Sequence, residues 1–140
     1  MNDTLRATFD LSRTAAALCD TLGALRAGGA RVLTARLPDP GRMLALPRSF
    51  ARPLARRIEA VNQVTDAVAV RYGTLHLDGT SHPSIYDSRM WSVDRLHPSE
   101  RGHRFLAGAY VDLLGGSGFP VGPRPGPDPG KVVRTAWAPG

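Results

Sequence analysis

The sequence is poor in cysteine and lacks long apolar runs. Its 140 residues contain one cysteine, Cys19, so the chain cannot form an internal disulfide and is not a disulfide-stapled scaffold. No apolar run approaches the roughly 18 residues that a membrane-spanning helix needs. The first residues lack the basic region, apolar run and small-residue cleavage site of a signal peptide. We therefore expect one globular domain without a membrane span, located in the cytoplasm.

Lysine is nearly absent, although the chain is basic. Of its 18 basic side chains 17 are arginine, and the formal net charge is +6. The excess is local: residues 1–57 contain ten arginines and four aspartates, whereas residues 58–140 contain eight basic and eight acidic side chains. Such an excess is one signature of nucleic-acid binding. We favour a GC-rich coding sequence as its origin and keep nucleic-acid binding as the alternative.

Glycine and proline concentrate at the C-terminal end of the chain. They make up 13 of the last 26 residues. A segment of this composition buries too little apolar surface to offset the entropy lost on ordering. We therefore expect residues 115–140 to form an extended, disordered tail and residues 1–114 to form the folded part.

Apolar spacing in the folded part predicts alternating helices and strands. The expected helices run from a cap at Asp10 or Ser12 to Gly28, from Pro53 in a first turn to Gly73, and from Ser99 to Leu114. Short strands are expected at residues 30–37 and 75–77. A strand, a helix and a strand in succession form a right-handed crossover, which makes the two strands parallel. The predicted fold class is α/β.

The connection after the second expected strand contains the residues best suited to chemistry. Residues 79–98 form a long irregular segment at the carboxyl end of a parallel strand, where open α/β sheets place their ligands. Asp94 precedes His97 by three residues, so its carboxylate can reach one imidazole nitrogen and leave the other free. A histidine held in this way is a positioned general base. An unrelated surface aspartate beside a histidine fits the same spacing.

Two segments resemble motifs of the SGNH/GDSL hydrolases. Residues 91–103, WSVDRLHPSERGH, resemble the last block of that family, a DxxH followed by proline and then by glycine and histidine. The opening residues resemble the third block, GxND, with Asn2 and Asp3 at the last two positions. The predicted order of helices and strands between them agrees with the family. The resemblance therefore covers residues 1 to about 114.

This resemblance implies an ester hydrolase on a three-layer α/β/α, flavodoxin-like fold. In such enzymes a serine attacks the acyl carbonyl, and the histidine matched by His97 takes its proton and returns it to the leaving alcohol. The aspartate matched by Asp94 orients that histidine, and the asparagine matched by Asn2 donates its amide to the oxyanion. The resemblance implies no metal and no cofactor. The expected partner is a small-molecule ester or other acylated substrate.

The serine block of that family is missing from the sequence. The nucleophile belongs to a GDS block and a further oxyanion donor to a second block, both upstream of GxND. None of the eight serines present lies in a GDS-like or GxSxG turn. We therefore expect an inactive C-terminal part of an SGNH domain, with two strands of a sheet ordered 2-1-3-4-5. Its unpaired first strand predicts a poorly folded or aggregation-prone chain.

Three explanations of the missing block remain open: a start codon assigned too far downstream, an inactive gene remnant, and a half that needs a partner chain. We favour the first, because Met1 occupies the variable position of a motif whose next residues are intact. Reading the DNA upstream in the same frame separates the first from the second, since either a glycine codon or a stop codon precedes Met1.

The alternative from a different class is a non-catalytic module that binds nucleic acid or phosphate. Its binding residues would be Arg31, Arg36, Arg42, Arg48, Arg52, Arg56 and Arg57. Against it, the stretch offers only Phe50 for base stacking, and no RRM, KH or zinc pattern appears. Other residues have plain readings: His76 in the core or at an edge, Ser92 as loop structure, Ser99 as a helix cap, and Asp78, His82 and Asp87 without metal-site spacing.

Overall fold

The computed structural model describes residues 4, 6 and 8–126 and has a short parallel sheet among helices. The elements are α1 (Leu11–Ala27), β1 (Leu33–Ala35), α2 (Pro40–Met43), α3 (Arg48–Tyr72), β2 (Leu75–Leu77), the 3₁₀ turns η2 (Pro83–Tyr86) and η3 (Ser88–Met90), and α4 (Glu100–Gly116). The predicted α/β class is confirmed. The flavodoxin-like topology of a larger sheet stays a prediction.

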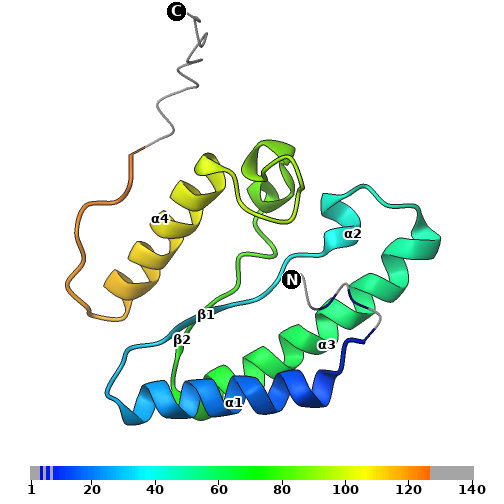
Figure 1. Ribbon diagram of the computed structural model, residues 1–140. Helices are drawn as coiled ribbons and strands as arrows, with labels where there is room; N and C mark the ends of the chain where they lie inside the picture. The colour runs from blue at the N-terminus through cyan, green and yellow to red at the C-terminus, as the bar shows by residue number, and fades with distance from the viewer. Residues whose placement is uncertain (1–3, 5, 7, 127–140) are drawn as a thin grey trace, which may run out of the picture.

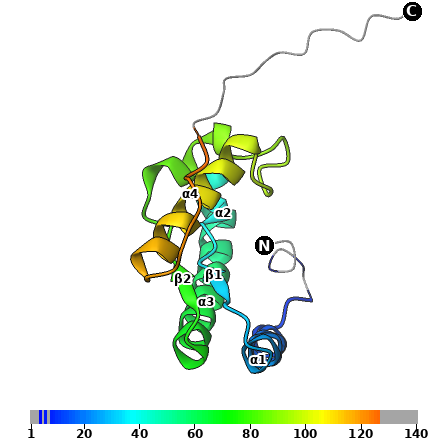
Figure 2. The ribbon, with the colours of Figure 1, turned by 90° about the vertical axis from the view of Figure 1, so that its left-hand side faces the viewer.

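The two strands pair in parallel, as the crossover pattern predicts. Leu33 lies opposite Leu75 and Ala35 opposite Leu77, and α3 connects the two strands. Figures 1 and 2 show the strands between α4 on one side and α3 on the other, with α1 packed along α3. The second edge of β1 pairs with no strand in the described part of the chain, and Leu33 is 37% exposed.

The first and last helices begin where their capping residues predict. The Asp10 carboxylate accepts hydrogen bonds from the backbone N–H groups of Ser12, at 2.8 Å, and Arg13, at 3.2 Å. Ser99 caps α4 by accepting from the backbone N–H of Gly102 at 3.2 Å. These bonds satisfy N–H groups that have no partner within the helix. Both predicted helix starts are therefore confirmed.

The predicted start of the central helix was wrong. The helix α3 begins at Arg48, and Pro53 lies inside it instead of in its first turn. Pro47 precedes the helix, and its carbonyl accepts from the N–H groups of Phe50 and Ala51, which closes the first turn. Pro53 removes one backbone donor, but Pro53 is exposed on the solvent side of the helix. The proline is tolerated there, so it does not mark the boundary.

The core lies between α1, α3 and the connection that follows β2. Its buried apolar side chains are Leu22, Met43, Ile58, Val61, Val68, Ala69, Ile85 and Met90. Asn62 of α3 is also buried, and its side chain both accepts from the N–H and donates to the carbonyl of Leu37, at 2.8 and 2.9 Å. This paired amide ties the end of β1 to α3 without leaving a buried polar group unsatisfied.

Residues 117–126 follow α4 without forming a helix or strand. Arg124 forms an ion pair with Asp112 of α4 at 3.1 Å, and the guanidinium of Arg31 lies over the ring of Phe119 at 4.9 Å. The remainder of the predicted tail, residues 127–140, lies outside the described residues. None of the described helices is both long and apolar enough to span a membrane.

Candidate functional site

The site is built on a tight loop between β2 and α4. Trp91 and Pro98 pair across its base as an antiparallel bridge, and the N–H of Ser92 donates to the carbonyl of His97 at 2.8 Å. At its tip Arg95 has a φ of 54°, the left-handed conformation that a non-glycine residue seldom adopts. The closed base and the bent tip bring positions 92, 94 and 97 onto one small loop.

Asp94 is the hub of this loop. Its Oδ1 accepts from the Ser92 hydroxyl at 2.6 Å and from the backbone N–H groups of Leu96, at 2.9 Å, and His97, at 3.1 Å. Its Oδ2 lies 2.6 Å from Nδ1 of His97. The Ser92 hydroxyl first, and then the His97 ring, hold the pKa of the Asp94 carboxyl well below its usual range. Asp94 is therefore ionised at neutral pH.

The ionised carboxylate determines which ring nitrogen of His97 carries the proton. A carboxylate only accepts hydrogen bonds, so the ring proton lies on Nδ1, which donates to Asp94. The lone pair of Nε2 is then free in the neutral imidazole. Within residues 4, 6 and 8–126, no hydrogen bond reaches Nε2, and the His97 side chain is 61% exposed. The loop thus presents a basic nitrogen to solvent.

The start of α4 holds this loop in place. The Ser99 hydroxyl donates to the carbonyl of Arg89 at 2.7 Å, and the Ser99 N–H donates to the carbonyl of Met90 at 2.9 Å. Gly102 packs directly on this segment, since a Cβ there would lie 2.1 Å from the Met90 oxygen. Only glycine allows this approach, which fixes the position of His97 relative to α4.

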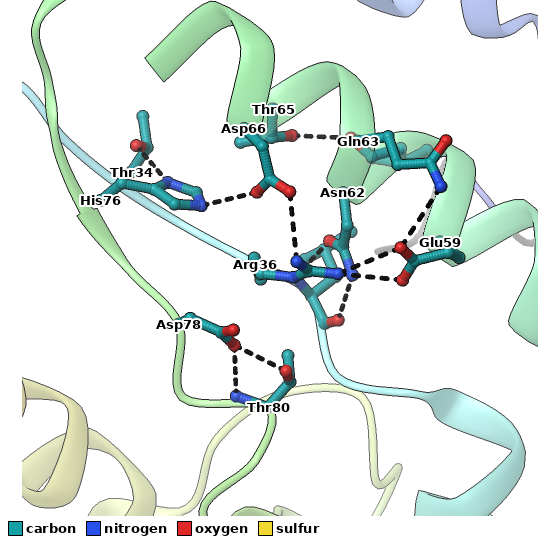
Figure 3. Close-up of polar contacts among 12 residues, drawn as sticks. Thr34, Arg36, Glu59, Asn62, Gln63, Thr65, Asp66, His76, Asp78 and Thr80 are labelled. Carbon is teal, nitrogen blue, oxygen red and sulfur yellow. Dashed lines mark hydrogen bonds and ion pairs between the residues drawn. The ribbon is translucent and has the colours of Figure 1, made fainter. Parts of the chain in front are cut away.

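A second histidine–aspartate pair joins β2 to α3 and is drawn in Figure 3. Nε2 of His76 lies 2.9 Å from Asp66, and its Nδ1 lies 2.8 Å from the hydroxyl of Thr34. Asp66 also pairs with Arg36 at 3.1 Å, and Arg36 reaches Glu59 at 2.9 Å. Both ring nitrogens of His76 are therefore engaged. This network joins β1, β2 and α3, in agreement with the structural role predicted for His76.

The third predicted site residue lies outside the described part of the chain. Asn2 and its neighbour Asp3 fall among the residues that the structure does not describe, so their predicted role stays a prediction. Thr4, which follows them, is buried at 4% exposure. The guanidinium of Arg57 on α3 donates to the carbonyls of Thr4 and Arg6 at 2.8 and 3.0 Å. These bonds attach the start of the chain to α3.

Sequence reasoning assigned Ser92 to loop structure and missed its contact with Asp94. The sequence feature that could have predicted this contact is a serine two residues before the aspartate. At that spacing the hydroxyl reaches the carboxylate within one turn. Trp91 anchors the loop, because its indole N–H donates to the carbonyl of Ile85 at 2.7 Å. No group of three metal-ligating side chains occurs among the described residues.

Comparison with known families gives a match over most of the chain. The model of the family described as GDSL-like Lipase/Acylhydrolase matches residues 1–105, a range that contains Asn2, Asp94 and His97. No curated protein matches the chain. No solved structure matches it either. The match spans the first three quarters of the sequence and ends within α4.

Proposed function

Because the chain belongs to the GDSL-like lipase/acylhydrolase family, we propose that it contributes the acid–base half of an ester hydrolase site. The observation that carries this proposal is the Asp94–His97 pair within the matched range, in which the His97 side chain is exposed and its Nε2 bonds to no other described residue. A base that is held on one side and open on the other has the form that acyl transfer requires.

In the proposed mechanism Nε2 of His97 takes the proton of a serine hydroxyl as that oxygen attacks the acyl carbonyl. The ring is then an imidazolium, and the ionised Asp94 stabilises its charge through Nδ1–H. His97 returns the proton to the leaving alcohol, and the same cycle activates water for the second half-reaction. The side-chain amide of Asn2 donates to the oxyanion, a contribution worth roughly 3 to 4 kcal/mol in comparable sites.

This sequence does not contain the nucleophilic serine in a recognisable motif. No hydroxyl in the described part of the chain bonds to Nε2 of His97, and no serine of the sequence follows a GDS pattern. We propose that the nucleophile lies on residues outside this sequence, either encoded upstream in the same frame or carried by a partner chain. The 140-residue chain alone is then inactive.

A fluorophosphonate probe and short-chain nitrophenyl esters test this proposal. The probe bonds covalently to activated serines, so it should label the protein extended upstream to include a GDS block and leave the 140-residue chain unlabelled. The extended protein should also hydrolyse the esters. Equal hydrolysis by the 140-residue chain would show that the missing serine is not needed. An extended protein that neither reacts with the probe nor hydrolyses any ester would refute the assigned function.

A further inference from the structure

The N-terminal half of α3 carries a stripe of three arginines, which we call the arginine stripe: Arg48, Arg52 and Arg56. Their spacing of four residues places them along the solvent side of the helix, and all three are exposed. They line an open groove of about 730 Å³ whose other lining residues are Ser49 and Pro53. None of the three side chains forms an ion pair or hydrogen bond with another described residue.

The other arginines of the basic segment have intramolecular contacts. Arg36 pairs with two carboxylates and Arg57 donates to backbone carbonyls. The guanidinium of Arg42 lies over the ring of Tyr86 at 3.6 Å, and that of Arg31 lies over Phe119. Four of the seven arginines in residues 31–57 therefore have intramolecular contacts. The other three form the arginine stripe.

The electrostatics of the arginine stripe are unfavourable in the free chain. Like charges at a spacing of four residues on a helix repel each other. The positive end of the helix dipole lies at the N-terminus, where cationic side chains are disfavoured. The first turn of α3 contains no acidic residue, and Pro47 provides no side-chain cap. An anion placed in the groove would relieve the repulsion and would also face the positive end of the helix.

We propose that the arginine stripe binds a ligand that carries several phosphate groups. Successive arginines are about 6 Å apart along the axis, at a rise of about 1.5 Å per residue. A guanidinium offers paired donors that match phosphate oxygens, which explains why arginine suits this site. Figure 1 shows the start of α3 and the connection that contains His97 at the same end of the molecule. The phosphates therefore bind at the end where the acyl group would react.

Calorimetric titration of the 140-residue chain with tripolyphosphate at low salt tests the proposal, with inorganic phosphate as the single-group comparison. Tripolyphosphate should bind at least tenfold more tightly than phosphate, because it can contact more than one guanidinium. The R48Q/R52Q/R56Q variant should lose at least tenfold of that affinity. Far-UV circular dichroism confirms that the helix content is unchanged. Equal affinity of the variant overturns the proposal, as does equal affinity for the two anions in a chain that anionic vesicles also fail to retain.

A charge-matched variant separates a site from general attraction to a basic protein. R13Q/R71Q/R101Q also removes three exposed arginines, from α1, α3 and α4, and so lowers the net charge of +6 by the same amount. It should keep its affinity for tripolyphosphate within about twofold of the unmodified chain, since counterion release from the specific contacts is retained. If the matched variant loses as much affinity as R48Q/R52Q/R56Q, no specific site exists.

Lipid vesicles distinguish the two sources of such phosphate groups. The chain is sedimented with phosphatidylcholine vesicles that do or do not contain phosphatidylglycerol. If the arginine stripe binds lipid headgroups, the anionic vesicles should retain the unmodified chain and the matched variant. They should not retain R48Q/R52Q/R56Q. Tripolyphosphate binding without vesicle retention supports it as a site for a soluble ligand. A chain that binds neither tripolyphosphate nor anionic vesicles overturns the proposal.

Discussion

The described part of the molecule contains two histidine–aspartate pairs, which share their side-chain types and differ in exposure and in their further hydrogen bonds. His97 and Asp94 lie three residues apart on an exposed loop, with side chains 61% and 48% exposed, and no other described residue bonds to Nε2 of the ring. His76 and Asp66 come from a strand and a helix, with side chains 20% and 37% exposed. The ring of His76 contacts Thr34 with its second nitrogen, whereas that of His97 offers it to solvent.

The difference shows what separates a reactive pair from a structural one. A carboxylate beside an imidazole orients the ring in both cases, but proton transfer needs a second ring nitrogen that the reacting hydroxyl can reach. In the His76 network every polar group of the ring is used to join two strands and a helix. On this difference we propose that His97 acts as the catalytic base and that His76 has a structural role. Variants of either pair test this assignment.

Replacing the exposed histidine should have the largest effect. In the upstream-extended protein, His97→Ala removes the general base, and kcat for a nitrophenyl ester should fall at least about 10⁴-fold. The unfolding midpoint in urea should change little, because the side chain is mostly exposed. His76→Ala is the matched control and should keep kcat within about tenfold. Activity of His97→Ala equal to that of the unmodified protein would reject the assigned base.

Neutralising the orienting carboxylate should have the next largest effect. Asp94→Asn removes the charge that stabilises the imidazolium and lets the ring proton move to Nε2, so kcat should fall by about 10² to 10⁴-fold. An unchanged kcat would show that Asp94 does not act on His97.

Removing the structural histidine should change stability and leave the chemistry intact. His76→Ala leaves Asp66 and Thr34 without their bonds to the ring in a partly buried network. The free energy of unfolding should fall by about 1 to 3 kcal/mol, the usual result of removing one partner from such a network. Urea titration of the upstream-extended protein measures this value. Unchanged stability would mean that the network does not join the strands to α3.

The smallest expected effect concerns the hydroxyl beside Asp94. Because Ser92 donates to Asp94, Ser92→Ala should raise the pKa of that carboxyl toward its ordinary value of 3.8. A lowered carboxyl pKa favours the folded state above pH about 4, and this contribution is lost as the pH falls through the folded pKa. Carboxyl carbon shifts followed by NMR against pH measure the change. If the pKa of Asp94 is the same in the variant, Ser92 does not stabilise the ionised carboxylate.

The sequence predicted the local parts of the structure better than the distant ones. Caps at Asp10 and Ser99 are encoded within a few residues, and so is the Asp94–His97 contact. The His76–Asp66 contact was not predicted, because it depends on how α3 packs across the sheet. The start of α3 was misplaced because a proline is also tolerated on the exposed side of a helix. The four-residue helix α2 is too short to show apolar periodicity.

The assignment of His97 as the base is tested most directly by determining which ring nitrogen carries the proton in the neutral imidazole. Long-range ¹H–¹⁵N NMR of the chain distinguishes a protonated nitrogen from one with a free lone pair. We expect the proton on Nδ1, bonded to Asp94, and a free lone pair on Nε2. A neutral ring with its proton on Nε2 would contradict it, because His97 could then not accept a proton from a nucleophile while Asp94 holds its other side.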